Sequence, residues 1–206
     1  MIRLHDYWRS SASYRLRIAL ELAGLDHNRL AVDLTRGEQQ APAHLAHNPQ
    51  GLVPVLEIDG LRLAQSLAII EYLDETRGLR LLPGDPAGRA RVRAIAHAIA
   101  MDIHPVCNLR VTNHVRQLTG ADFVIEDWMA RFLGPGLAAV EAMVDDGDFC
   151  HGGRLSLADL CLVPQIYNAR RWGIDLAPLP RLRRIEAHLA ALPAFARAHP
   201  DRVKPA

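Results

Sequence analysis

The sequence predicts a small α/β domain followed by an all-helical domain. Three observations support this fold class. Strand-like and helix-like segments alternate over residues 1–81. Two prolines and a glycine within residues 82–86 mark a linker. Beyond the linker the strand signals vanish and long segments of helical spacing follow. The predicted domains therefore cover residues 1–81 and residues 87–206.

The first segments form a β-α-β unit. Residues 2–7 and 30–34 have the composition of short strands, and residues 13–23 lie between them. Apolar residues recur in this middle segment at the spacing of an α-helix, at Leu16, Ala19, Leu20 and Ala23. A strand, a crossover helix and a second strand imply parallel pairing with a right-handed connection.

A hairpin and a third helix complete the first domain. The strand-like runs 55–58 and 61–64 are joined by Asp59-Gly60, the strongest short-range hairpin signal. Ser66 then begins a helix that ends near Gly78. The order β-α-β followed by β-β-α around a four-stranded mixed sheet is the thioredoxin-like arrangement.

The second half predicts helices over residues 89–118, 123–144, 157–172 and 182–192. Ser156 and Asp159 match the capping box that begins a helix, so we interpret this pair as a folding signal rather than a site.

Composition excludes some functions. The 206 residues include 24 Lys+Arg and 23 Asp+Glu, a net charge of +1. This charge argues against electrostatic capture of nucleic acid or of an anionic membrane. No run of eighteen apolar residues predicts a membrane span, and no signal peptide is evident. Three widely spaced cysteines, Cys107, Cys150 and Cys161, predict reduced thiols and a cytoplasmic location.

The histidines do not predict a metal site. His44 and His47 lie one helical turn apart, but the sequence shows no third ligand. His97 and His114 also lack the spacing of known metal motifs. We therefore expect no metal.

The loop before the first helix is the candidate reactive site. A thioredoxin-like fold places its reactive group at this helix N-terminus, where free N–H groups stabilise a thiolate. Here the segment is Arg9-Ser10-Ser11-Ala12-Ser13, without cysteine. Serine hydroxyls there suit a thiol that a ligand brings in; alternatively, Ser10 or Ser11 only caps the helix. Val53-Pro54 before a strand, and Gln65-Ser66 at another helix start, add donors for an elongated anionic peptide.

Four segments carry a family resemblance that covers nearly the whole chain. Residues 9–20, with the pattern RSSxSxRxRIAL, and residues 48–54, 65–73 and 157–165 resemble zeta-class glutathione transferases. The resemblance implies the glutathione transferase architecture, a homodimer, and glutathione as cofactor. It also implies cis–trans isomerisation of maleylacetoacetate to fumarylacetoacetate by thiolate addition, bond rotation and elimination. Maleylpyruvate, from gentisate breakdown, is the alternative substrate that the resemblance leaves open.

The resemblance also implies roles for individual residues. Ser10 would hydrogen-bond the glutathione sulfur, with Ser11 as its neighbour in the catalytic pair. Positions matching glutathione-binding residues, with Val53 preceding a cis-proline, are Gln39, Val53, Gln65, Ser66, His104 and Asn108. Ala12 departs from the pattern, because many members carry cysteine there.

Three arginines suit a small dicarboxylate substrate, namely Arg9, Arg110 and Arg171. A guanidinium binds a carboxylate through two parallel hydrogen bonds, which an ammonium cannot do. Arg170 is a near-equal candidate by sequence, and both helical-domain arginines could instead be solvated surface charges. A general conjugating enzyme for apolar electrophiles and a non-catalytic interaction protein remain as alternatives.

Overall fold

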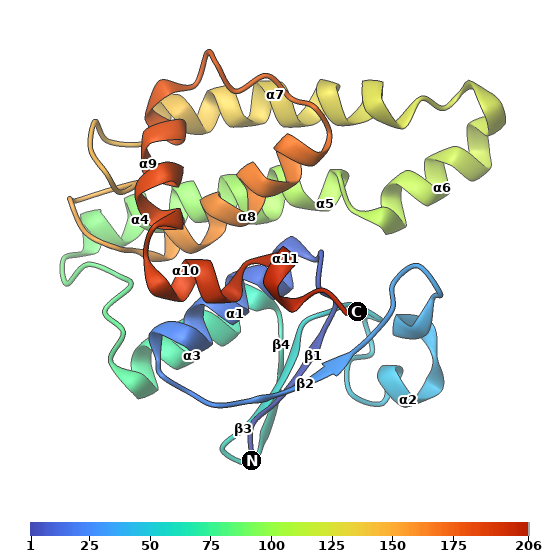
Figure 1. The fold of residues 1–206 in the computed structure, drawn as a ribbon, viewed down its shortest axis with the longest axis horizontal. Helices are drawn as coiled ribbons and strands as arrows, with labels where there is room; N and C mark the ends of the chain where they lie inside the picture. Colours follow the sequence, from blue (N-terminus) through green and yellow to red (C-terminus); the bar gives the residue numbers. More distant parts are fainter. Residues whose placement is uncertain (206) are drawn as a thin grey trace. The chain divides into compact units, whose positions relative to one another are not determined.

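The computed structural model describes residues 1–205, which divide into two compact units. The first unit contains residues 1–81 and 191–205. Its elements (Figure 1) are β1 Arg3–Asp6, α1 Ser11–Leu22, β2 Asn28–Ala31, the 3-10 helix η1 Glu38–Gln40, α2 Pro42–Leu45, β3 Val55–Ile58, β4 Leu61–Ala64, α3 Ser66–Arg77, α10 Pro193–Ala198 and α11 Pro200–Val203.

The first unit is built on a four-stranded sheet with the order β2-β1-β3-β4. β1 pairs with β2 in parallel, whereas the pairs β1–β3 and β3–β4 are antiparallel. This is the predicted thioredoxin-like topology. The predicted hairpin is also present: Asp59 and Gly60 have φ values of 53° and 78°, as a tight turn between antiparallel strands requires.

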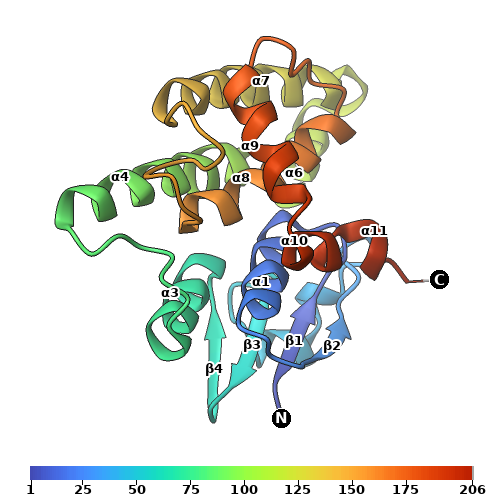
Figure 2. The ribbon, with the colours of Figure 1, turned by 60° about the vertical axis from the view of Figure 1, so that its left-hand side comes forward.

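The strand register assigns side chains to the two faces of the sheet. Leu4 pairs with Leu56, and both are fully buried on the face that α1 and α3 cover (Figure 2). The neighbouring residues His5 and Glu57 point to the opposite face, because side chains alternate along a strand. α2 lies on that second face, where the His44 ring is 6.0 Å from the His5 ring.

The second strand is displaced from its predicted position. We expected residues 30–34, but β2 runs from Asn28 to Ala31. Asp33 explains the early end, since its carboxylate accepts hydrogen bonds from both the backbone N–H and the hydroxyl of Thr35. These bonds begin a turn in place of the next ladder pair.

The C-terminal residues belong to the first unit, although the sequence assigned residues 87–206 to one helical domain. Hydrogen bonds tie this segment to α1, among them one from Arg197 Nε to the Glu21 carboxylate. The Tyr14 hydroxyl donates to the Phe195 carbonyl at 3.4 Å, and Arg17 Nε donates to the Ala198 carbonyl at 3.0 Å. Phe195 is 1% exposed, so its ring is part of this unit's core.

The second unit, residues 82–190, is helical throughout. Its elements are α4 Pro86–His97, the π-helix η2 Ala98–Ile103, α5 His104–Val106, α6 Leu109–Thr119, the 3-10 helix η3 Gly120–Asp122, α7 Ile125–Met143, α8 Leu157–Arg171 and α9 Pro180–Ala190. The predicted capping box of Ser156 and Asp159 begins α8. Within residues 1–205, every helix is too short or too polar to cross a lipid bilayer.

The prediction of one continuous helix over residues 89–118 is wrong. The segment is divided into α4, η2, α5 and α6. Pro105 has no backbone N–H, so the regular ladder cannot continue through it. Asn108 then adopts an extended conformation and caps α6, with its side-chain oxygen 3.0 Å from the Arg110 nitrogen.

Candidate functional site

The sheet register gathers four loops of the first unit at one edge. His5 pairs with Val55, and Val55 pairs with Ala64, so β1 and β4 end where β3 begins. β2 ends at the same edge, because Ala31 pairs with Asp6. These loops and the first residues of the helices that follow them carry six of the predicted site residues: Ser10, Ser11, Gln39, Val53, Gln65 and Ser66.

Ser10 stands directly before α1 and caps it. Its hydroxyl oxygen accepts a hydrogen bond from the backbone N–H of Ser13 at 3.2 Å. The first turn of α1 contains no acidic residue, so nothing on the helix neutralises its positive N-terminal end. The next residue, Ser11, is 5% exposed. Ser10 can therefore both cap the helix and donate its hydroxyl proton to an anion.

Gln65 and Ser66 begin α3 at the same edge. Gln65 has φ 70°, a left-handed conformation that costs free energy in a residue other than glycine. Its amide donates to the side-chain oxygen of Gln50 at 2.7 Å, which links α3 to the loop before β3. The hydroxyl of Ser66 accepts from Arg15 Nη1 at 3.3 Å, which links α3 to α1.

Two residues in these contacts were missed by the sequence analysis, Gln50 and Arg15. Arg15 is 2% exposed although it carries a charge. The sequence contained a signal for Arg15, because it lies in a helix that has apolar residues on two faces. A charged side chain in such a helix is buried and needs hydrogen-bond partners. Nothing in the local pattern around Gln50 indicates its bond to Gln65.

Val53 and Gln39 offer polar groups at this edge. The Val53–Pro54 peptide bond is cis, as the resemblance implied. Within residues 1–205, the backbone N–H and C=O of Val53 have no recorded hydrogen-bond partner. The side-chain oxygen of Gln39 is buried and also lacks a partner among these residues. Such groups are stabilised when a ligand supplies the missing hydrogen bonds.

Arg9 is held by its aromatic neighbours. Its guanidinium donates to the Tyr7 hydroxyl at 3.2 Å and lies 5.0 Å from the Trp8 ring centre. These residues line a cavity of about 440 Å³ that Asp33 also borders. Arg9 thus places a positive charge in the loop that carries Ser10, directly before that serine in the chain.

A buried ion pair supports that loop. Asp6 is 1% exposed, and its two carboxylate oxygens accept from Arg17 Nη1 at 2.7 Å and Arg29 Nε at 2.8 Å. Arg17 also donates to the Trp8 carbonyl at 2.9 Å. Burial lowers the pKa of Arg17, whereas the charge of Asp6 opposes this shift. Arg17 therefore fixes the chain immediately before Ser10.

The remaining predicted residues lie in the second unit. His104 begins α5, Asn108 caps α6, and Arg110 is exposed in the first turn of α6. Arg171 is exposed at the end of α8, 5.8 Å from the Trp172 ring centre. The adjacent Arg170 is paired with Glu186 at 2.7 Å. This ion pair engages the Arg170 guanidinium.

The protein's own thiols are poorly suited to nucleophilic chemistry. Burial raises the pKa of Cys107 to about 11. It also raises the pKa of Cys150 well above its usual value, and Cys161 is fully buried. Position 12, in the first turn of α1, is alanine. A reactive thiol at the edge of the sheet would have to come from a ligand.

The chain is similar to glutathione S-transferases along both units. The family model for their N-terminal domain matches residues 1–75, and that for their C-terminal domain matches residues 122–191. The chain is 59% identical to a maleylacetoacetate isomerase of Rhizobium meliloti, over 98% of this chain and 97% of that protein.

Two solved structures extend this comparison. One is the holo structure of a maleylpyruvate isomerase, a bacterial zeta-class enzyme: TM-score 0.94, 42% identity, 99% of each chain covered. The other is a maleylacetoacetate isomerase from Anaeromyxobacter dehalogenans with dicarboxyethyl glutathione and citrate bound in its active site. It has a TM-score of 0.88 and 46% identity, covering 100% of this chain and 97% of that one.

Proposed function

Because the chain belongs to the zeta class of the glutathione S-transferase family, we propose that it is a glutathione-dependent maleylacetoacetate isomerase. The observation that carries the chemistry is the Ser10 hydroxyl at the open N-terminus of α1. The relative that is 59% identical over 98% of the chain bears the name of this activity, which supports the choice of substrate.

The polar groups at the edge of the sheet fit glutathione. Glutathione resembles a tripeptide, so its amide N–H and C=O groups can form hydrogen bonds with the backbone of Val53. Another of its N–H groups can donate to the buried side-chain oxygen of Gln39. A carboxylate would accept from the N-terminus of α3 at Gln65 and Ser66. From the second unit, His104 and Asn108 are proposed as further glutathione contacts on the strength of the family resemblance alone.

Glutathione would supply a nucleophilic thiol that adds to the cis double bond of the substrate and is expelled after bond rotation. Ser10, with Ser11 beside it, would hold this thiol as the thiolate. Lowering a thiol pKa of about 8.5 by two units takes about 2.7 kcal/mol. A hydroxyl bond to a charged acceptor contributes about 1.5–3 kcal/mol, and a helix N-terminus about 0.3–1 kcal/mol. The two contributions together are of the required size.

Arg9, Arg110 and Arg171 would bind the carboxylates of a small dicarboxylate. They would also stabilise the negative charge that develops on the substrate as the thiol adds. The relative solved with a dicarboxyethyl glutathione and citrate supports an acidic ligand. An apolar electrophile would have to desolvate these guanidinium groups, which disfavours a general conjugating role.

The test is a comparison of kcat/KM for maleylacetoacetate and maleylpyruvate, each with and without glutathione. We expect glutathione to be required and maleylacetoacetate to be preferred. A preference for maleylpyruvate would make maleylpyruvate, rather than maleylacetoacetate, the proposed substrate. The TM-score of 0.94 to a maleylpyruvate isomerase is the reason for including it in the test. No turnover of either substrate, with no retention on immobilised glutathione, would favour a non-catalytic interaction protein.

A homodimer and a cytoplasmic location belong to the same proposal. Leu61 lies on the edge strand β4, and it is 47% exposed in the single chain. An exposed apolar side chain of this kind is what a subunit interface would cover in a dimer. Light scattering at micromolar concentration should give the mass of two chains; the mass of one chain would contradict the dimer. All three cysteines are free thiols, as is usual in a reducing compartment.

A further inference from the structure

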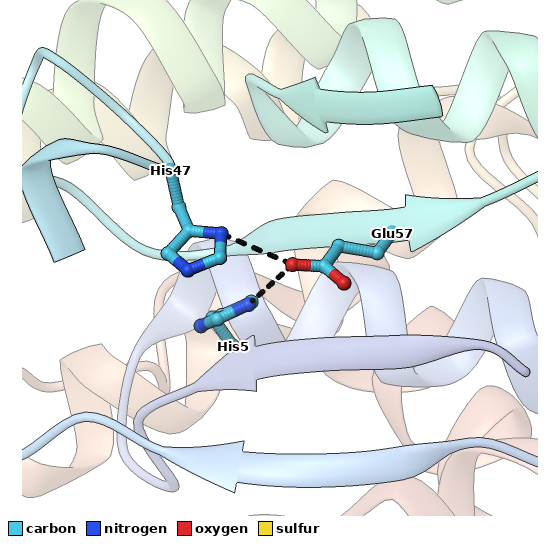
Figure 3. Close-up of side chains that lie close together, drawn as sticks. All are labelled: His5, His47 and Glu57. Atoms are coloured by element: carbon cyan, nitrogen blue, oxygen red, sulfur yellow. Dashed lines mark hydrogen bonds and ion pairs between the residues drawn. The ribbon is translucent and has the colours of Figure 1, made fainter. Parts of the chain in front are cut away.

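Three polar side chains converge on the face of the sheet that α2 covers. His5 on β1 and Glu57 on β3 share this face because Glu57 pairs with Arg3, two residues before His5. His47 follows α2 and reaches the same place. Figure 3 shows both imidazole rings directed at one oxygen of the Glu57 carboxylate.

The distances suit coordination of a metal ion. Glu57 Oε1 lies 3.2 Å from His5 Nε2 and 3.0 Å from His47 Nδ1. The three atoms all lie within 4.8 Å of one another. Ligand atoms about 2.0–2.1 Å from a tetrahedral zinc ion are separated by about 3.3–3.4 Å. The two separations from Glu57 Oε1 come within a few tenths of an ångström of this spacing, and a bound ion would also draw the two histidine nitrogens, which lie within 4.8 Å of each other, to it.

The hydrogen bonds leave one of these nitrogens unsatisfied. His5 Nε2 donates to Glu57 Oε1, because an ionised carboxylate can only accept. His47 Nδ1 is buried and has no partner in hydrogen-bonding geometry within residues 1–205, although it is close to the same oxygen. A buried nitrogen without a partner is costly, and coordination to a cation would satisfy it.

The charges around the cluster both help and oppose a cation. Arg3 Nη1 lies 3.4 Å from the second oxygen, Oε2, and so fixes the carboxylate while leaving Oε1 available. Arg62 Nε lies 4.0 Å from Oε1 itself, and its Nη1 donates to the Ala46 carbonyl at 2.9 Å. Arg62 is thus a positive charge that a bound cation would have to tolerate.

We propose that His5 Nε2, His47 Nδ1 and Glu57 Oε1 bind one divalent transition-metal ion of the zinc class. Two imidazole nitrogens and one carboxylate oxygen are a ligand set that zinc takes, with water at the fourth position. Coordination through Nε2 requires the His5 tautomer that carries its proton on Nδ1, so Nε2 releases its proton to solvent and Nδ1 takes one up. The ion would join three parts of the first unit: strand β1 through His5, strand β3 through Glu57, and the segment after α2 through His47.

The experiment uses the full chain without an affinity tag, stripped of metal with a chelator. Zinc is titrated in competition with a chromophoric indicator, and cobalt is added separately because its visible spectrum reports tetrahedral coordination. We expect one zinc ion per chain, and His47→Gln and Glu57→Gln should each weaken binding by at least about tenfold. Zinc at a hundredfold excess over Kd should raise the Tm of the unmodified chain by about 5 °C.

Two further variants sharpen the test. His27 lies in the same unit outside the cluster, with Nδ1 3.0 Å from the Leu25 carbonyl, so His27→Gln should bind zinc unchanged. Arg62→Met removes the opposing charge and should tighten binding. Circular dichroism of the metal-free proteins verifies that each variant folds.

Several results would overturn the site. Zinc binding that His47→Gln and Glu57→Gln leave intact would place the ion elsewhere. Absence of binding by the unmodified chain in molar excess of zinc would reduce the cluster to a hydrogen bond between His5 and Glu57. Weaker rather than tighter binding in Arg62→Met would contradict the proposed electrostatics.

Discussion

The hydroxyl oxygen of Ser10 accepts a hydrogen bond from the backbone N–H of Ser13 at 3.2 Å. This contact uses a lone pair of the oxygen and leaves the hydroxyl proton available for a further acceptor. Capping a helix and stabilising a thiolate, which the sequence posed as alternatives for Ser10, are therefore compatible in one side chain. A variant series can separate the two roles.

Ser10→Gly should raise the pKa of bound glutathione and strongly lower turnover. Glycine is a tolerated N-cap, so removing the hydroxyl this way should cost only a few tenths of a kcal/mol of stability. Ser10→Thr keeps both the hydroxyl and the cap and should retain most of the activity. The measurement is the ultraviolet absorbance of the bound thiolate as a function of pH.

An unchanged thiolate titration in Ser10→Gly would limit Ser10 to its capping role. Ser11, at the first position of α1, would then become the candidate for the sulfur contact.

Arg171→Ala should reduce turnover of the dicarboxylate by about a hundredfold, the effect of losing about 2.7 kcal/mol from the transition state. Conjugation of an uncharged electrophile should change little, because it presents no carboxylate. Arg171→Lys should recover part of the loss, since an ammonium cannot form the paired hydrogen bonds of a guanidinium. Steady-state kinetics with both substrates measure these effects.

Arg170→Ala is the matched control for this prediction. Arg170 is paired with Glu186, so its removal should leave both reactions close to their original rates. Equal losses on charged and neutral substrates in Arg171→Ala would mean that Arg171 supports the fold or glutathione binding instead.

Asp6→Asn should destabilise the protein by about 3–5 kcal/mol. The change leaves the 2% exposed guanidinium of Arg17 without its counter-charge, and an uncompensated buried charge is strongly unfavourable. Arg29→Gln removes the more exposed partner of Asp6, whose side chain is 31% exposed, and should cost about 1 kcal/mol or less. Urea unfolding monitored by circular dichroism compares the two; similar losses would show that the Arg17 pair is not the dominant contribution.

Cys107 should react slowly with alkylating reagents at neutral pH. Its pKa of about 11 keeps it protonated, and only the thiolate is nucleophilic. The rate should rise about tenfold per pH unit between pH 7 and 9. At pH 8 it should be roughly 200-fold below that of a free thiol of pKa about 8.5. Mass spectrometry of the labelled protein follows the reaction.

Cys107→Ser should abolish this labelling, because Cys150 and Cys161 are fully buried in the folded protein. A pH-independent rate, or labelling near that of a free thiol, would show that burial does not raise the pKa of Cys107 in this way.

Local patterns determined much of the first unit. Asp59-Gly60 specifies the hairpin by its own backbone conformation, and Ser156 with Asp159 specifies the start of α8. The β-α-β order was also predictable from hydrophobic spacing, and with it the position of Ser10 directly before α1. These features depend on residues a few positions apart, whose preferences act before any tertiary contact forms.

Contacts between distant segments were decided only by the tertiary structure. The convergence of His47 on His5 and Glu57, the bond from Arg15 to Ser66, and the return of residues 191–205 to the first unit depend on register and packing across the chain. The sequence alone predicted a domain built on a four-stranded sheet, with a serine at the N-terminus of its first helix. Which polar side chains share a face of the sheet, and the pairing of Arg170 with Glu186, depend on packing between segments that no local pattern encodes, since each side chain's partners lie far along the chain.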